Sequence, residues 1–542
     1  MDAVTTVPTP VNEPVRSYAP GTPERESLRR RLAELEGDKH ELTQTIAGRR
    51  RQAGGEPFDV VQPHDHGHVL GVSAQATPQD VADAVAAAKA AAREWSELPF
   101  DERAAVFLRA ADLIAGPYRD TLNAATMLGQ SKSVQQAEID AACELIDFLR
   151  FNVAYARRIL AEQPNSAPGA WNRMDYRPLD GFVVAITPFN FTAIAGNLPS
   201  SPALMGNTVV WKPTPSQQLA AHYTMQVFEE AGLPPGVINM VTGDGQAVSQ
   251  VALPDPGFAG LHFTGSTATF KLLWRTITDH LDGYGSYPRI VGETGGKDFV
   301  VAHPSANPDK LVTALVRGAF EYQGQKCSAV SRAYLPRSLW EDGLRERLAD
   351  LTRSVTYGDI TDFSLFGGAV INARAFAKHR ELLASVDSDP AVDVLVGGGC
   401  DDRVGYFVEP TVLVSQDPAH TLFSTEYFGP IMAVHVYPDA DYERILDVVD
   451  TSAPYALTGA VFADDRAAVQ QAHRALRRTA GNFYVNDKPT GSVVGQQPFG
   501  GSRASGTNDK AGSMFNLLRW VSPRSIKETF DAPTDISYPH MG

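Results

Sequence analysis

Three things are scarce in this chain of 542 residues: cysteine, long apolar runs and basic charge. The cysteines Cys143, Cys327 and Cys400 are odd in number and lack zinc-ligand spacing, which favours a reducing compartment over a disulfide framework. No apolar run approaches the ~20 residues that span a bilayer, and residues 1–20 resemble neither a signal peptide nor a transit peptide. These absences predict a cytoplasmic protein with no membrane partner.

Acidic residues outnumber basic ones by 63 to 48, so the formal net charge is −15. This surplus argues against nucleic acid as a partner, and an anionic substrate would need a local site built to receive it. The remaining composition, with 43% hydrophobic and 20% charged residues, is typical of a globular enzyme. Because the chain is too long for one ordinary core, we expect two or three domains.

The N-terminal third is predicted to be helical after an extended start. Residues 1–20 have no helical period and are expected to cross the surface or a neighbouring subunit. Helices are expected over residues 22–48, 77–98, 101–115 and 132–160. Cys143 lies in the last helix, where a core thiol is the expected role. Glu144 is one residue further on, so it faces elsewhere and is a candidate for the site.

Three alternating histidines, His64, His66 and His68, raise the question of a metal site, because alternate residues of a strand share one face. No acidic or thiolate cluster elsewhere in the sequence offers a completing ligand. We therefore interpret this segment as a polar surface loop and expect no metal.

From Gly181 onward, short apolar strands alternate with helices, which is typical of a parallel α/β sheet. Strands are expected at 182–187, 208–212, 237–242, 261–264 and 289–291, and helices at 200–205, 217–231 and after residue 266. A second α/β unit is expected from residue 298 to about 484, with helices over 308–320, 339–355 and 373–385. Ligands of such sheets bind at the carboxyl ends of the strands.

Two stretches have the residues for covalent catalysis. Cys327 follows Lys326, whose positive charge is expected to lower the thiol pKa and favour the nucleophilic thiolate. Glu293 stands among glycines in the run 292–297, where the backbone gives a carboxylate room to swing toward a reacting centre. Cys327 is the candidate nucleophile and Glu293 the candidate base. The alternatives are an inert buried thiol and an exposed loop acid.

Three further motifs fall where strands are expected to end. Asn190 carries an amide that can stabilise a developing oxyanion or, equally, cap the next helix through an Asx turn. Lys212 follows the next strand in Trp211-Lys212-Pro213, and alone it is more typical of an exposed lysine. Gly265 and Ser266 precede a helix, whose N-terminal N–H groups and dipole favour a pyrophosphate.

The motif F-x-x-x-G-Q-x-C at 320–327, together with G-E-T-G-G-K at 292–297, resembles the aldehyde dehydrogenase superfamily. The resemblance implies an α/β fold with a Rossmann-type NAD-binding domain, an α/β catalytic domain and a small oligomerisation segment. The implied divisions are residues 1–292, which include the helical region, 293–484 and 485–542. NAD is the implied cofactor, and a homodimer or larger homo-oligomer is the implied assembly.

The resemblance also assigns roles to residues. Asn190 and the backbone N–H of Cys327 would form the oxyanion hole. The cofactor would contact Thr187, Pro188, Phe189, Lys212, Gly265, Ser266, Glu426 and Phe428. The chain departs from the common pattern at Phe270, where many relatives have glycine, and at Pro215, where many have an acid. A preference for NAD over NADP therefore rests on resemblance and not on a readable contact.

Within the superfamily, the runs 187–192, 325–328 and 491–499 look most like the Δ1-pyrroline-5-carboxylate dehydrogenase (L-glutamate γ-semialdehyde dehydrogenase) family. This implies NAD-dependent oxidation of the semialdehyde to glutamate through a cysteine thioester, the second step of proline degradation, with proline dehydrogenase as a functional neighbour. Ser328, Gly491 and Ser492 would bind the substrate's α-carboxylate. Phe191 and Phe499 would pack on its aliphatic chain, and Glu144 is a further substrate-binding candidate.

Two alternatives stay open. Another semialdehyde dehydrogenase would keep every cofactor motif and differ only at Ser328 and Gly491-Ser492. A thiol hydrolase or acyltransferase would need Cys327 and a base but no dinucleotide. It would be expected to use a histidine partner, and no histidine lies near Cys327 in the sequence.

Overall fold

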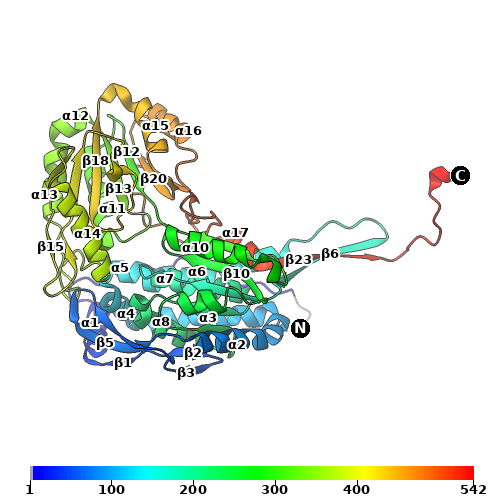
Figure 1. The fold of residues 1–542 in the computed structure, drawn as a ribbon. Coiled ribbons are helices and arrows are strands. Elements are labelled where there is room, and N and C mark those ends of the chain that lie inside the picture. The colour runs from blue at the N-terminus through cyan, green and yellow to red at the C-terminus, as the bar shows by residue number, and fades with distance from the viewer. Residues whose placement is uncertain (1–3) are drawn as a thin grey trace.

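Two seven-stranded sheets organise the chain, and the short segment between strands β11 and β12 joins them (Figure 1). The computed structural model describes residues 4–542, so residues 1–3 of the extended start lie outside the described residues. The first sheet lies in the lower part of Figure 1 and the second in the upper left part. Both sheets have the mainly parallel strands that the sequence predicts.

The first sheet has the strand order β11-β10-β7-β8-β9-β2-β3. Its parallel strands are β7 (Phe182–Ile186), β8 (Val209–Lys212), β9 (Ile238–Met240), β10 (Phe258–Thr264) and β11 (Arg289–Glu293), and β2 (Gln44–Ile46) and β3 (Arg49–Arg51) are antiparallel. Each predicted strand is present. Alternate residues face opposite ways, so Phe182 packs in one core and Val183 in another.

Helices cover both faces of this sheet. The face that includes Phe182 packs against α2 (Pro78–Glu97), α9 (Gln246–Val251) and α10 (Thr267–Asp279). The other face packs against α7 (Thr192–Leu204) and α8 (Gln218–Glu230), and beyond them lie α3 (Phe100–Ala115), α4 (Arg119–Gln130), α5 (Val134–Ala137) and α6 (Leu145–Ala161). A π-helical turn, Glu138–Glu144, joins α5 to α6. The sequence did not predict α4 as a helix of its own.

The prediction of one helix over residues 22–48 is wrong. Helix α1 (Pro23–Gly37) ends at a glycine, and Asp38 is already extended, so the chain turns into β1 (His40–Glu41), β2 and β3. The apolar stripe of Leu28, Leu32 and Leu35 is buried as expected. Leu42 is also buried, but from the loop between two strands and not from the helix.

The second sheet has the order β14-β17-β18-β13-β12-β20-β21, and only β14 is antiparallel to its neighbour. Its strands are β12 (Asp298–Ala302), β13 (Val330–Pro336), β14 (Val392–Val396), β17 (Thr411–Ser415), β18 (Ile431–Tyr437), β20 (Thr458–Phe462) and β21 (Asn482–Val485). Helices α11 (Pro308–Phe320), α12 (Arg337–Leu339) and α13 (Arg345–Arg353) lie on one face, and α14 (Ala373–Val386), α15 (Tyr442–Thr451) and α16 (Arg466–Ala475) on the other.

A two-stranded arm projects from the first sheet's half of the molecule (Figure 1). It pairs β6 (Ala170–Pro178) antiparallel with β23 (Val521–Thr529), and the chain continues beyond it to residue 542. The remaining short elements are β4 (Pro57–Gln62), β5 (Asp65–Ala74), β15 (Cys400–Asp401), β16 (Phe407–Val408), β19 (Tyr455–Ala456), β22 (Ser502–Arg503) and α17 (Met514–Leu517). The sequence did not predict β6.

The interpretation of the histidine segment as a surface loop is wrong, because the segment from Asp65 onward belongs to strand β5 and His64 is buried, where it contacts Ser131 through Nδ1 and Oγ (3.1 Å). His66 and His68 lie in β5 and bond the backbone carbonyls of Asp402 and Glu36. Among residues 4–542, no three His, Cys, Asp or Glu side chains are grouped closely enough to hold a metal. No helix in that range is long and apolar enough to cross a bilayer.

Candidate active site

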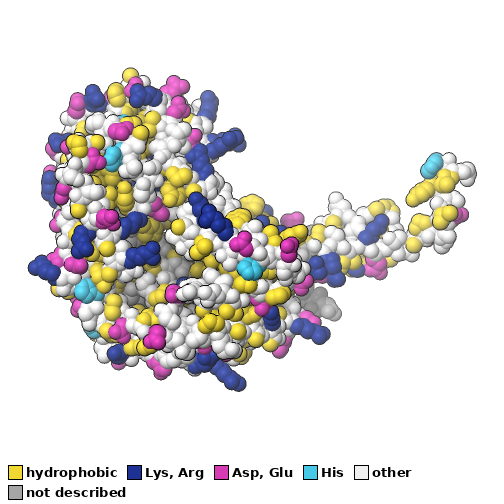
Figure 2. Space-filling model, in the orientation of Figure 1, with side chains coloured by type: hydrophobic (Ala, Val, Ile, Leu, Met, Phe, Trp, Pro, Cys, Tyr) yellow, Lys and Arg dark blue, Asp and Glu magenta, His cyan; other side chains and the backbone are white. Residues whose placement is uncertain are grey.

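Cys327 lies where the two sheets meet, in a pocket that is also lined by Gly296, Lys297, Glu426 and Phe428. Figure 2 shows the hollow between the two parts of the molecule in the same orientation as Figure 1. The carboxyl ends of β7, β8 and β11 face this junction with the motifs that follow them. The structure thus brings together residues that are more than a hundred positions apart in the chain.

The turn before the nucleophile has an unusual backbone. Tyr322, Gln323 and Gly324 all have positive φ, at 49°, 52° and 64°. Two non-glycine residues in this region cost about 1–3 kcal/mol each, so the surroundings must hold them in place. The Gln323 side chain does so by donating to the carbonyls of Ser131 (3.0 Å) and Ala369 (2.7 Å). A strained and well-braced turn therefore fixes the position of the thiol.

The expectation that Lys326 lowers the pKa of Cys327 is wrong. The Lys326 ammonium instead bonds Glu321 (2.9 Å). Burial raises the pKa of the Cys327 thiol well above its ordinary value, and the negative charges of Asp298, Glu293 and Glu426 raise it further. The free protein therefore holds the nucleophile mainly as a protonated thiol near neutral pH.

Glu293 ends strand β11, and its carboxylate accepts a hydrogen bond from the Gly501 N–H (3.2 Å). Burial raises the pKa of Glu293 well above its ordinary value, and the Gly501 bond and the charge of Lys510 only partly offset this. A carboxyl group with a raised pKa can take a proton from water near neutral pH. The position of Glu293, in a glycine-rich segment, suits the role of base that the sequence predicts.

Asn190 is buried, and its side-chain amide donates to the Gln325 carbonyl (3.1 Å), two residues before the thiol. The alternative of an Asx turn is not what the structure has, because Asp140 caps α7. Its carboxylate accepts from the N–H groups of Thr192 (3.0 Å) and Ala193 (2.9 Å). Asn190 therefore belongs to the nucleophile's surroundings and not to the helix cap.

The expected cofactor residues of the first sheet lie side by side. The Thr187 hydroxyl accepts from the Trp211 indole N–H (3.0 Å), and the Thr187 N–H donates to the Lys212 carbonyl (3.1 Å). Burial lowers the pKa of Lys212 to about 8, with only the charge of Asp244 opposing this. A buried ammonium without an ion pair among the described residues is suited to bond neutral hydroxyls such as those of a ribose.

Gly265 and Ser266 lead into α10, where Ser266 caps the helix by accepting from the Thr269 N–H (3.1 Å). The exposed helix N-terminus suits a pyrophosphate. Phe270, the departure from the common pattern, is explained by packing. Its ring stacks on Phe263 (5.5 Å between centroids) and fills the space over Gly292, where a Cβ would lie 2.2 Å from it.

The second sheet contributes Glu426 and Phe428. The Glu426 carboxylate accepts from the Gly296 N–H (2.9 Å), and a Cβ at Gly295 would lie 2.0 Å from it, so that position requires glycine. The Phe428 ring meets Phe189, which follows β7 beside Pro188, in an edge contact with 5.8 Å between centroids. The expected cofactor motifs of the two sheets therefore touch, and the described residues fit a dinucleotide.

The expected substrate site adjoins the thiol through Ser328, the residue after Cys327. The hydroxyls of Ser328 and Thr490 lie 2.8 Å apart, which links the nucleophile to the loop of Gly491 and Ser492. Gly491 has φ +90°, a conformation that disfavours a side chain. Phe499 is held by a pair of backbone bonds to Ala511 (3.0 and 2.8 Å).

Phe191 and Glu144 flank a buried ion pair that the sequence did not indicate. Lys132 bonds Asp140 (2.6 Å), and its ammonium lies 4.2 Å from the Phe191 ring centroid and 4.5 Å from that of Tyr322. Burial and the charge of Asp140 raise the pKa of Glu144 to about 8, opposed by the charges of Lys132 and Lys326. No sequence pattern indicates the Lys132–Asp140 ion pair, because it can be recognised only once the fold shows that both side chains are buried together.

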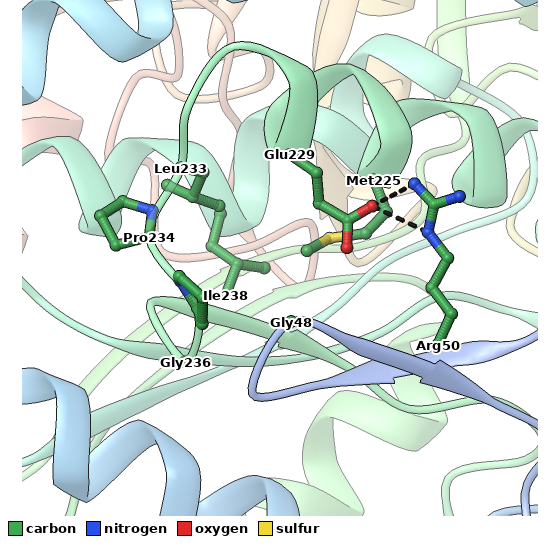
Figure 3. A pocket seen from close by; sticks show the side chains of 9 residues that line it. Gly48, Arg50, Met225, Glu229, Leu233, Pro234, Gly236 and Ile238 are labelled. Atoms are coloured by element: carbon green, nitrogen blue, oxygen red, sulfur yellow. Dashed lines mark hydrogen bonds and ion pairs between the residues drawn. The ribbon is translucent and has the colours of Figure 1, made fainter.

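A second pocket, of about 520 Å³, lies apart from this site (Figure 3). It is bounded by Gly48, Arg50, Met225, Glu229, Leu233, Gly236 and Ile238. Arg50 donates to Glu229 (2.9 Å), so its two charged groups neutralise each other. The pocket lies at the amino-terminal end of β9, whereas the expected cofactor residues follow the carboxyl ends of the strands. It has no nucleophile.

Cys327 is held in a braced turn between the two sheets, together with the carboxyl group of Glu293 and residues that fit a dinucleotide. This arrangement defines an oxidoreductase that uses covalent thiol chemistry. The chain belongs to the aldehyde dehydrogenase family, whose model matches residues 50–525. This membership confirms the predicted family and α/β fold and excludes the thiol hydrolase alternative.

Individual relatives are similar to this chain over nearly its whole length. A probable delta-1-pyrroline-5-carboxylate dehydrogenase of Schizosaccharomyces pombe is 49% identical over 532 residues, 97% of each chain. Crystal structures of the delta-pyrroline-5-carboxylate dehydrogenase from Mycobacterium tuberculosis, one of them bound with NAD, are 64% identical and cover 100% of both chains with a TM-score of 0.97. Proline utilization A of Bdellovibrio bacteriovorus is 28% identical with a TM-score of 0.90, over 98% of this chain and 55% of that one.

Proposed function

We propose that this protein oxidises L-glutamate γ-semialdehyde, the open form of Δ1-pyrroline-5-carboxylate, to L-glutamate with NAD, as the second step of proline degradation. The observation that carries the proposal is the Ser328–Thr490 contact of 2.8 Å. This contact supports the proposal because it joins Ser328, the residue after Cys327, to the loop of Gly491 and Ser492, whose hydroxyl and backbone N–H groups are able to donate to an α-carboxylate. Full-length similarity to delta-1-pyrroline-5-carboxylate dehydrogenases supports the choice of this substrate over other semialdehydes.

In the mechanism that follows, the Cys327 thiol first loses its proton to solvent, and the thiolate then attacks the aldehyde carbon. The amide of Asn190 and the Cys327 N–H stabilise the oxyanion that forms. NAD, when bound by Lys212, the α10 N-terminus and Glu426, supplies the hydride acceptor. Loss of hydride leaves a thioester on Cys327. A water molecule that gives its proton to Glu293 then hydrolyses this thioester to glutamate and releases the Cys327 thiolate.

The substrate contacts form part of the same proposal. Ser328, Gly491 and Ser492 bind the α-carboxylate, Phe191 and Phe499 pack on the methylene chain, and Glu144 faces the substrate. The organisation is proposed to follow the divisions 1–292, 293–484 and 485–542. A cytoplasmic location, a homodimer or larger homo-oligomer, and a functional link to proline dehydrogenase complete the proposal.

The direct test is NADH formation from Δ1-pyrroline-5-carboxylate, with succinate semialdehyde and acetaldehyde measured in parallel. We expect kcat/KM to be greatest for Δ1-pyrroline-5-carboxylate, because only its open form carries an α-carboxylate at the right distance from the aldehyde. A preference for succinate semialdehyde would instead support the second candidate, another semialdehyde dehydrogenase.

A further inference from the structure

A closed ring of contacts ties the nucleophile to the glycine-rich loop. The Glu321 carboxylate bonds the ammonium groups of Lys326 (2.9 Å) and Lys488 (3.2 Å) through the same oxygen. Lys326 is followed directly by Cys327 and Ser328, and the Ser328 hydroxyl meets Thr490. The Thr490 carbonyl then accepts from the Lys488 ammonium (3.2 Å), which closes the ring.

This ring has more positive charge than negative. Two lysines share one carboxylate, so the cluster carries one net positive charge when both lysines are protonated. Burial alone would raise the pKa of Glu321, but Lys326 and Lys488 outweigh it and lower the pKa, so the carboxylate is ionised. Lys326 is buried and the Glu321 side chain is 14% exposed, whereas the Lys488 side chain is 23% exposed. Lys488 therefore lies on the solvent side of the ring.

The position of Lys488 relative to the loop is the second observation. A Cβ added to Gly491 would lie 3.1 Å from the Lys488 nitrogen, so no other group separates the two. An ammonium group has three N–H donors, and Glu321 and Thr490 occupy two of them. One donor stays available beside the loop to which the α-carboxylate is assigned.

We propose that Lys488 is a specificity-determining residue. Its surplus positive charge selects aldehydes that carry a carboxylate, and Glu321 is the positioning residue that fixes it against the loop. The inference rests on the proposed function and extends it. It explains how a chain with a formal charge of −15 accepts an anionic substrate: the attraction is local.

The test compares wild type with Lys488→Met and Lys488→Arg, using glutamate semialdehyde and the uncharged aldehyde pentanal. Methionine keeps the length and apolar stem of the side chain, and arginine keeps its charge. Lys310→Met is the matched control, because Lys310 is exposed at the far end of α11 and its loss changes the net charge by the same amount.

For Lys488→Met we expect kcat/KM for the semialdehyde to fall about tenfold, mostly through KM, with little change for pentanal. Lys488→Arg should restore most of the preference, and Lys310→Met should match wild type. An equal loss on both aldehydes would overturn the inference by showing a purely structural role, and so would an unchanged ratio.

A second variant guards against a folding artefact. Glu321→Gln removes the charge that holds both lysines, so we expect it to impair both aldehydes by disturbing the Cys327 turn and, because Lys488 is then no longer fixed against the loop, also to reduce the preference for the anionic one. Loss of the preference in Glu321→Gln, with Lys488→Met unaffected, would place the selecting charge on Lys326 instead. If wild type itself fails to prefer the semialdehyde, the proposed function fails, and that outcome is separate from these.

Discussion

At the scale of single residues, the main finding is the protonation state of the nucleophile Cys327. Cys327 is surrounded by Asp298, Glu293 and Glu426, and burial and these charges raise the pKa of its thiol. Its neighbour Lys326 is paired with Glu321. The position of Lys326 next to Cys327 in the sequence therefore did not predict the thiol pKa, because consecutive side chains point in different directions.

The raised pKa predicts how the free protein reacts with alkylating agents. Only thiolate is alkylated, so the rate at Cys327 should be low at pH 7 and should still be rising above pH 9, the ordinary thiol pKa. Iodoacetamide labelling of the Cys327 peptide, followed by mass spectrometry across pH 6 to 10, measures this. A rate that levels off below pH 8 would contradict the assigned environment. Cys143, which is buried and also has a raised pKa, serves as an internal comparison.

Ser328→Ala tests the carboxylate contact. If the hydroxyl donates to the α-carboxylate, its loss removes a charge-assisted bond worth roughly 1.5–3 kcal/mol, so kcat/KM for glutamate semialdehyde should fall about ten- to a hundredfold. An uncharged aldehyde of similar length should change little. If both aldehydes lose activity equally, Ser328 only positions Cys327 and the carboxylate role is wrong.

At the scale of elements, the strands were predictable and the long-range partners were not. Short runs of buried apolar residues such as Val183 and Val209 identify strands of a parallel sheet, and the sequence motifs then fall at their ends. The end of α1 was missed because its charged sequence continues past Gly37 without a proline. The pairs Lys132–Asp140 and Lys488–Glu321 were missed because ion pairing depends on tertiary structure.

Helix α2 offers a stability test at this scale. Asp80 forms a capping box with Thr77 and also accepts from the Gly54 N–H (2.9 Å) and Gln44 (2.7 Å). Burial would raise the pKa of Asp80, but these hydrogen bonds outweigh it and hold the pKa below its ordinary value. Asp80→Ala should therefore reduce the free energy of unfolding by about 2 kcal/mol at pH 7.

The stabilisation that Asp80 provides decreases at low pH. Because the pKa of folded Asp80 is depressed, its stabilisation is present above the unfolded value of about 4 and is lost as pH falls further. Urea denaturation of wild type and Asp80→Ala should differ at pH 7 and converge in acid. Asp83→Ala, whose side chain is 44% exposed on the same helix, is the control and should cost little. A similar cost for both variants at pH 7 would contradict the cap's role.

At the scale of the whole molecule, the arm of β6 and β23 stands clear of both sheets (Figure 1). Large apolar side chains are exposed on the chain beyond it, with Phe530, Ile536 and Tyr538 at 66%, 93% and 67% exposure. Apolar groups on a projecting segment are typical of a subunit contact. This observation supports the proposed homo-oligomer.

Ile536→Asp should weaken that assembly, since it places a charge where an apolar contact is proposed. Analytical ultracentrifugation should find wild type as a dimer or larger and the variant shifted toward the monomer. Val404→Asp, at an exposed apolar residue of the second sheet's half, should sediment like wild type. A monomeric wild type would refute the proposal, and so would an unchanged mass in Ile536→Asp.

The central claim is that Cys327 forms a thioester whose hydrolysis requires Glu293. The most direct measurement combines Glu293→Gln with Δ1-pyrroline-5-carboxylate and NAD, follows NADH by stopped flow, and determines the mass of the Cys327 peptide. We predict a burst of about one NADH per active site, then slow turnover, with a glutamyl group on Cys327 that is absent when NAD is omitted. Steady NADH formation with no adduct on Cys327 would contradict the account.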